Sequence, residues 1–393
     1  MANDVLETLE GLRLQLCAQA AEAEELGSLP GNTADILRKT GLVKMLQPRR
    51  HGGLEMDPWD FFDAVILAAE SCSATGWVAG VLGSHPWQMA LMPESVQHDV
   101  WAADPDTWIA SPFSPFGKAR RVEGGYLLSG KWAFSSGTDH CEWAWLGAIV
   151  VDAEGNRVGT DGTLHMLLPR SDYTIIDGSW NAVGLRGSGS KDVTVTDAFV
   201  PLERVIAEEK VVSGVAAREA GRSESLFRMP WSAIFPNAIT ASIIGMCRGA
   251  LAASFDYQRD RVDEAGRLVR EDKFLLAQLS ECCSEVESAR AQMMANVHRI
   301  WDIVDSGKEV PFEIRAAARC DQVRGSRRAV EALDRLYSLS GGNALRSDRP
   351  MQRFWRDAHA GLNHAINVYS GPYQAYALTK MGAVVPPNLR HDI

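Results

Sequence analysis

Histidine and nucleophilic side chains of this sequence could take part in catalysis, but few have the spacing that a metal site or a catalytic nucleophile requires. His359 and His364 lie five residues apart, so on one helix they would point about 140° away from each other. They are therefore not a zinc pair. The sequence also lacks His-Glu-x-x-His, Cys-x-x-Cys and Gly-x-Ser-x-Gly. Their absence excludes the common metallohydrolase and serine hydrolase classes, and no metal site is expected.

A glycine-rich segment, GLRGSGSK from Gly184 to Lys191, looks superficially like a phosphate-binding loop. In such a loop Lys follows the last glycine directly, and a dinucleotide fingerprint opens a helix. Here a serine stands between the last glycine and Lys191, and strand-forming residues follow. We interpret the segment as a β-turn. The sequence therefore gives no sign that the chain binds its own nicotinamide hydride donor.

Composition and charge exclude several other classes of protein. The chain has 393 residues, of which 46% are hydrophobic and 23% charged, as in ordinary globular proteins. Forty basic and 50 acidic side chains give a net charge of -10, which argues against nucleic acid and membrane surfaces as partners. Seven scattered Cys read as reduced thiols, and the acidic N-terminus does not resemble a signal peptide. We expect a cytoplasmic protein.

The elements that must position any site fall into three regions, which predict an α+β fold. Residues 1–103 show apolar residues at helical spacing and form an N-terminal α-helical domain. Residues 104–205 hold short β-branched and aromatic runs between Gly and Asp turns, which indicates a central antiparallel β-barrel or sandwich. After a polar linker at 206–224, residues 225–393 form a four-helix bundle, with helices near 235–263, 272–306, 312–340 and 349–369.

This domain order resembles the acyl-CoA dehydrogenase superfamily, and four segments spread over the chain carry the resemblance. They are Pro48–Leu54 (PRRHGGL), Gly130–Gly137 (GKWAFSSG), Val183–Pro201 and Gln352–His359 (QRFWRDAH). Three features resemble one branch, the oxygenase components of two-component flavin-dependent aromatic monooxygenases. These are Ser73–His85 (SATGWVAGVLGSH), the Ser135-Ser136-Gly137 turn and Arg356–Gly361. Within that branch the sequence is most similar to enzymes that hydroxylate 3-hydroxy-9,10-secoandrostatrienedione, and more distantly to the p-hydroxyphenylacetate hydroxylase oxygenase.

One departure separates the chain from the dehydrogenases. Many of them carry a Glu nine residues after the Arg of the Arg-Asp-Ala segment, where it removes a proton from the acyl-CoA. In this sequence the position is Ala365, which cannot accept a proton, and its neighbour is His364. Two alternatives stay open at this point: an acyl-CoA dehydrogenase with another base, and a flavin oxygenase that acts on an indole, nitrogen or sulfur centre.

The resemblance implies a reaction and its partners. Reduced FMN or FAD, supplied by a separate NAD(P)H-dependent reductase, would react with O2 to give a C4a-hydroperoxyflavin. This species would hydroxylate a phenolic aromatic substrate, with a fused-ring or secosteroid phenol as the leading expectation. In the superfamily the flavin lies between subunits, so the resemblance also implies a homotetramer.

The resemblance also assigns roles to residues of this sequence. His364 would sit beside the flavin, His85 would handle the phenol proton, and Ser136 would contact flavin N5; histidine suits such roles because small shifts move its charge across neutral pH. Arg261 would pair with the flavin phosphate, although a solvated surface role is equally open. The residues expected to bind the cofactor are Trp77, Ser111, Phe113, Phe134, Ser135, Ser136, Arg261, Gly342, Asn343, His364 and Ala365.

Overall fold

The N-terminal third of the chain is helical. The computed structural model describes residues 2–159, 162–390 and 393. Five α-helices precede the first strand, and the fourth of them is buried at every position. They are α1 (Ala2–Leu26), α2 (Gly31–Thr40), α3 (Pro58–Ser71), α4 (Ser73–Met89) and α5 (Glu94–Trp101).

Among the described residues one eight-stranded sheet follows, in the order β6-β7-β3-β2-β4-β5-β8, with β1 beside β4. Most neighbours are antiparallel, as expected, but β4 runs parallel to both β1 and β2. The parallel pairing arises because β2 and β3 form a hairpin and the chain then crosses to the other side of β2. The strands are β1 (Ile109–Ala110), β2 (Gly117–Val122), β3 (Gly125–Ser135), β4 (Trp143–Val151), β5 (Leu164–Pro169), β6 (Thr174–Ile176), β7 (Lys191–Pro201) and β8 (Val205–Ala207).

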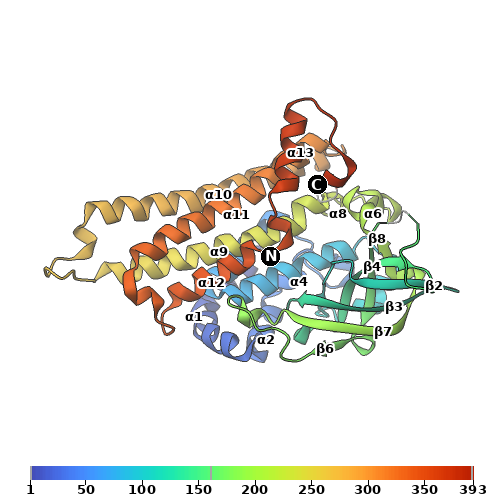
Figure 1. Cartoon of the computed structure of the whole chain (residues 1–393), viewed down its shortest axis with the longest axis horizontal. Helices are drawn as coiled ribbons and strands as arrows, with labels where there is room; N and C mark the ends of the chain where they lie inside the picture. The colour runs from blue at the N-terminus through green and yellow to red at the C-terminus, as the bar shows by residue number, and fades with distance from the viewer. Residues whose placement is uncertain (1, 160–161, 391–392) are drawn as a thin grey trace.

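The C-terminal half is a bundle of long helices that extends away from the sheet (Figure 1). α9 (Trp231–Arg259) lies at its centre, against α10 (Lys273–Asp305), α11 (Phe312–Leu339) and α12 (Pro350–Leu362). In the part of the chain that the structure describes, α9 alone is long and apolar enough to cross a membrane, and 78% of that apolar window is buried by the protein itself. This burial is that of a core helix. The α+β fold class predicted from the sequence is confirmed.

The structure differs from the expected elements in two places. The segment expected to be a polar linker at 206–224 contains the short helices α6 (Glu208–Val212) and α7 (Val215–Glu219), and α8 (Ser225–Arg228) follows directly. The helix expected to reach residue 369 ends at Leu362, and a second short helix, α13 (Ser370–Lys380), comes later. The carbonyl of Gly361 at this helix end accepts the N–H of His364 at 3.1 Å and the side-chain amide of Asn367 at 3.2 Å.

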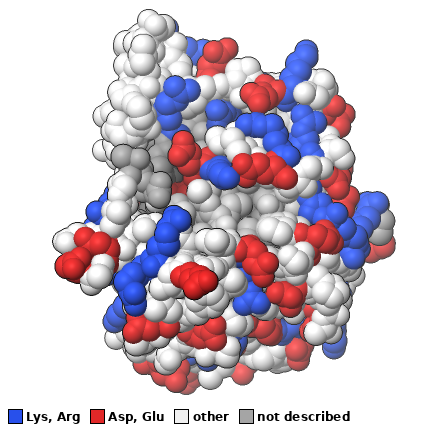
Figure 2. All heavy atoms as spheres, turned by 90° about the vertical axis from the view of Figure 1, so that its right-hand side faces the viewer, with Lys and Arg blue, Asp and Glu red and all other residues white. Residues whose placement is uncertain are grey.

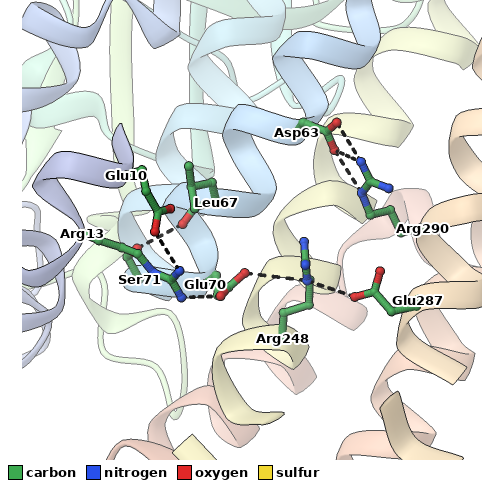
Figure 3. Close-up of polar contacts among 9 residues, drawn as sticks. All are labelled: Glu10, Arg13, Asp63, Leu67, Glu70, Ser71, Arg248, Glu287 and Arg290. Atoms are coloured by element: carbon green, nitrogen blue, oxygen red, sulfur yellow. Dashed lines mark hydrogen bonds and ion pairs between the residues drawn. The ribbon is translucent and has the colours of Figure 1, made fainter. Parts of the chain in front are cut away.

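Ion pairs join the N-terminal helices to the bundle (Figure 3). Arg290 of α10 makes a bidentate contact with Asp63 of α3, at 2.6 and 2.7 Å. Further along α3, Glu70 pairs with Arg13 of α1 and lies 3.7 Å from Arg248 of α9. These partly buried pairs fix α3 between α1 and the bundle. The helix that follows α3 is thereby held in place.

That following helix, α4, packs closely on its neighbours through glycines. A Cβ atom on Gly76 would lie 2.2 Å from the Cβ of Ala69 in α3, and one on Gly80 would lie 2.7 Å from the hydroxyl of Ser242 in α9. Real Cβ atoms essentially never approach so closely. α4 therefore reaches its position only because these side chains are absent.

We predict that Gly76→Ala lowers the free energy of unfolding by at least about 2 kcal/mol, because the backbones of α3 and α4 must separate. Gly325→Ala in α11 is the matched control, since its Cβ would meet Ala289 at an ordinary 3.7 Å. In that variant the higher helix propensity of Ala should raise the free energy of unfolding by up to about 1 kcal/mol. Urea unfolding of both variants measures the difference, and equal stability would contradict the packing argument.

Candidate active site

The first polar group of the site joins α4 to the chain just after β1. The Nε2 atom of His85 lies 2.5 Å from the hydroxyl oxygen of Ser111. His85 is 1% exposed, and aromatic rings surround it: Phe235 stacks on it at 6.2 Å and Phe113 meets it edge-on at 5.5 Å. The pair is a polar contact inside an apolar shell.

Burial sets the charge of His85. It lowers the pKa of the imidazole to about 3, and nearby His165 contributes in the same direction. At neutral pH the ring is therefore uncharged, with one nitrogen that donates and one that accepts. A neutral imidazole beside a rotatable hydroxyl can share the proton of a phenol.

Behind this pair lies a second buried histidine that the sequence did not reveal. The ring of His165, in β5, stacks on Phe113 with centroids 4.3 Å apart. Its Nδ1 is 3.1 Å from the side-chain amide of Gln88, and its Nε2 is 3.9 Å from a carboxylate oxygen of Glu208. Only the fold brings β5 against α4, so no local pattern could have identified the contact.

The second polar group lies where α4 meets the end of β3. The indole N–H of Trp77 donates to the hydroxyl of Ser136 at 3.2 Å. His364, just beyond α12, meets the ring of Trp77 edge-on at 5.8 Å. Three residues far apart in the sequence thus lie together.

The protonation of His364 can be read from its own contacts. Its Nδ1 accepts the backbone N–H of Ile366 at 3.2 Å, so in the neutral ring the proton sits on Nε2. Burial lowers its pKa to about 4. At neutral pH His364 is therefore an uncharged ring with an Nε2–H donor.

The turn that carries Ser136 is strained and tightly held. Phe134 adopts a left-handed backbone with φ 67°, which is costly for an aromatic residue, and its ring is exposed and edge-on to Trp180. A Cβ on Gly137 would lie 2.9 Å from Val78 of α4, so the turn rests on that helix. The hydroxyl of Ser135 is buried without a hydrogen-bond partner in the described part of the chain. Such an unpaired polar atom suits a site completed by a ligand.

Phe235 of α9 connects the two polar groups. It stacks on His85 and lies 6.0 Å from the ring of His364. The two groups therefore lie around one cluster of aromatic rings between α4, the sheet and α9, which we call the aromatic compartment. A flat ring system with polar edges fits this donor set, so the residues present are compatible with a flavin.

Three other residues expected to bind the cofactor lie outside this compartment. Arg261, Gly342 and Asn343 gather near the end of α9, where Arg261 bonds to Gln258 and Asn343 to Tyr257. α9 runs 24 residues from Phe235 to Arg259, about 36 Å along its axis. That end of the bundle is far from the sheet (Figure 1). Ala365 lies beside His364 and is exposed.

Comparison with known proteins gives a consistent picture. Residues 237–369 match the family described as acyl-CoA dehydrogenase, C-terminal domain. The chain is 46% identical to a pigment production hydroxylase of Rhodococcus erythropolis, over 98% of both chains. It is 40% identical to the flavin-dependent monooxygenase oxygenase subunit HsaA of Rhodococcus jostii, over 96% of this chain and 98% of the relative. The crystal structure of 3-HSA hydroxylase from Rhodococcus sp. RHA1 superposes with TM-score 0.93 at 39% identity, covering 99% of this chain and 100% of the other.

Because the pKa of His85 is lowered in the folded protein, acid should destabilise the fold. The unfolded chain takes up a proton near pH 6.5 and the folded chain only near pH 3. Stability is therefore lost as the pH falls below about 6.5, by about 2 kcal/mol between pH 7 and pH 5 from this residue.

We predict that His85→Asn shows a shallower loss of unfolding free energy over this range, measured by urea unfolding at each pH. His98→Asn, at an exposed position on α5, is the control and should keep the slope of the unsubstituted protein. Parallel slopes for all three proteins would contradict the assignment of a neutral, buried His85.

Proposed function

The chain belongs to the family of flavin-dependent monooxygenase oxygenase components that hydroxylate aromatic compounds, and we propose that its aromatic compartment orients the flavin and the substrate for this reaction. It is an enzyme that uses reduced flavin and O2, and the flavin comes from a separate reductase component. The observation that carries the proposal is the arrangement of two polar groups, His85 with Ser111 and Ser136 with Trp77, around one aromatic ring, Phe235.

The flavin side of the compartment is formed by Trp77, Ser136 and His364. Reduced FMN or FAD, when bound, would supply the electrons that activate O2; one oxygen atom of O2 would go to the substrate and the other would leave as water. The Trp77 ring would provide an apolar wall, and the Ser136 hydroxyl would form a hydrogen bond at flavin N5. The Nε2–H of His364, whose ring lies against Trp77, would be a further donor there. These groups would exclude water from the flavin and hold its protons.

The substrate side is formed by His85 and Ser111. A phenol hydroxyl that replaces their direct 2.5 Å contact would donate its proton to the neutral imidazole and accept from the serine. Sharing the proton makes the aromatic ring more electron-rich and so a better acceptor of oxygen. The surrounding rings, Phe113 and Phe235, favour a flat substrate with a single hydroxyl, and we favour a fused-ring phenol.

The two sides can be separated by kinetics. We predict that His85→Ala reduces the rate of hydroxylation about a hundredfold or more, while reduced flavin is still oxidised by O2 with release of H2O2. His364→Asn should instead slow the reaction of reduced flavin with O2, which stopped-flow absorbance follows directly. His98→Asn, on exposed α5, controls for loss of a histidine. Hydroxylation retained in His85→Ala would remove this residue from the mechanism.

The remaining cofactor residues suggest how the chains assemble. Arg261 and Asn343 are too far from His364 along α9 to reach the same flavin within one chain. We propose that they contact the phosphate end of a flavin bound mainly by a second copy, in a homotetramer. Each site would then draw residues from two chains.

Co-expression of two inactive variants tests this shared site. Arg261→Ala and His364→Asn should each lose activity as homo-oligomers. If one site needs both residues from different chains, random assembly restores about a quarter of the sites. Activity of the mixture no higher than that of the separate variants would contradict a shared site.

A further inference from the structure

The glycine-rich segment from Gly184 to Lys191, which we interpreted as a β-turn, contacts the candidate active site through its serines. It carries Ser188 and Ser190, whose hydroxyl oxygens lie 2.7 Å apart. The hydroxyl of Ser190 is in turn 2.8 Å from that of Ser136. All three side chains are buried, with Ser188 at 0% exposure and Ser190 at 3%. The result is a chain of three hydroxyls that ends at the residue proposed to contact the flavin.

Hydrogen-bond counting restricts how this chain can be oriented. A serine hydroxyl has one hydrogen and two lone pairs, and an indole N–H can only donate. Because Trp77 donates to Ser136, that hydroxyl already accepts one bond. Its single hydrogen can then point either to Ser190 or into the aromatic compartment.

The two directions differ in which hydrogen is left without an acceptor. If Ser188 donates to Ser190 and Ser190 donates to Ser136, the hydrogen of Ser136 is left for the compartment. In the reverse direction the hydrogen of Ser188 has no acceptor, since within the described residues its hydroxyl contacts only Ser190. A buried unsatisfied donor costs about 1–3 kcal/mol. The forward direction leaves the hydrogen of Ser136 without an acceptor among the described residues in the same way, so the direction depends on what a ligand beside Ser136 offers.

The backbone of this segment is fixed on both sides, so the hydroxyls have little freedom to rearrange. The N–H of Leu185, in a left-handed conformation with φ 52°, donates to the carboxylate of Asp357 at 2.6 Å. The N–H of Gly137 donates to the carbonyl of Ser188 at 2.9 Å. A Cβ on Gly184 would lie 2.2 Å from the carbonyl oxygen of Arg356. The segment is thus held between α12 and the Ser136 turn.

We propose that Ser190, supported by Ser188, is a positioning residue that holds the Ser136 hydroxyl beside flavin N5, where its oxygen can accept the N5–H of reduced flavin. This inference rests on the proposed flavin contact of Ser136. Ser190 does not touch the flavin itself; it accepts the hydrogen of Ser136, so that one lone pair of that hydroxyl stays available to the flavin. Without that bond the Ser136 hydroxyl can rotate away, and oxygen is lost as H2O2 before it reaches the substrate.

Removing the Ser190 hydroxyl should uncouple the reaction. We predict that Ser190→Ala releases about two- to tenfold more H2O2 per flavin oxidised, as expected for one lost hydrogen bond. Ser190→Thr keeps a hydroxyl and should restore coupling, whereas Ser188→Ala should show a smaller effect of the same sign. Thr138→Val is the control, because it removes a buried hydroxyl from the same turn without touching the chain of serines. Normal coupling in Ser190→Ala would overturn the proposal.

A double variant shows whether Ser190 acts through Ser136. If it does, Ser136→Ala together with Ser190→Ala releases no more H2O2 than Ser136→Ala alone, because the two residues form one interaction. Additive effects would mean that Ser190 acts independently and would overturn the proposal.

A readout in the flavin-free protein separates this inference from the proposed function. The indole N–H of Trp77 donates to Ser136, so its NMR resonance in 15N-tryptophan-labelled protein reports the state of that hydroxyl. Ser190→Ala should move this resonance, while Ser190→Thr and Thr138→Val leave it in place. An unmoved resonance in Ser190→Ala overturns the hydroxyl chain. Failure of the unsubstituted protein to hydroxylate any phenol would instead overturn the proposed function.

Discussion

The complete burial of α4 is the constraint on which the rest of the site depends. The helix passes between α3, α9 and the sheet, and it fits only because Gly76 and Gly80 leave room for neighbouring atoms. It carries Trp77 toward the flavin side and His85 toward the substrate side, eight residues and about 12 Å apart along the axis. The separation that we propose between cofactor and substrate would therefore be set by one helix. The ion pairs of α3 in Figure 3 secure the surface against which that helix packs.

Burial also governs the electrostatics of the compartment. Both His85 and His364 are held uncharged, so neither brings a permanent positive charge into an apolar space. Polar atoms in the compartment act instead as neutral donors and acceptors with defined partners. The outer surface is different, because Lys and Arg are interspersed with Asp and Glu over the face shown in Figure 2. The compartment that we propose for the reaction thus contrasts with this charged face.

Much of this arrangement could be predicted from the sequence, and the failures share one cause. Helical and strand periodicity gave the three regions and the bundle, because these depend on residues close in the chain. The end of α12 was missed because it depends on Asn367 folding back on Gly361. The sequence did not reveal His165 or the proposed role of Ser190. Both depend on contacts between β-domain residues and α4 or its neighbours. Arg261 lies beyond the far end of α9, so its expected contact with the flavin phosphate stays a prediction.

We propose, as the central claim, that Ser136 and His85 face the same compartment from opposite sides and divide it between flavin and substrate. A crystal structure of the protein with reduced flavin and a fused-ring phenol, prepared without oxygen, tests this claim most directly. The account predicts flavin N5 within hydrogen-bonding distance of the Ser136 hydroxyl, and the phenol oxygen between His85 and Ser111. A flavin bound away from Ser136, or a phenol whose oxygen points away from His85, would contradict it.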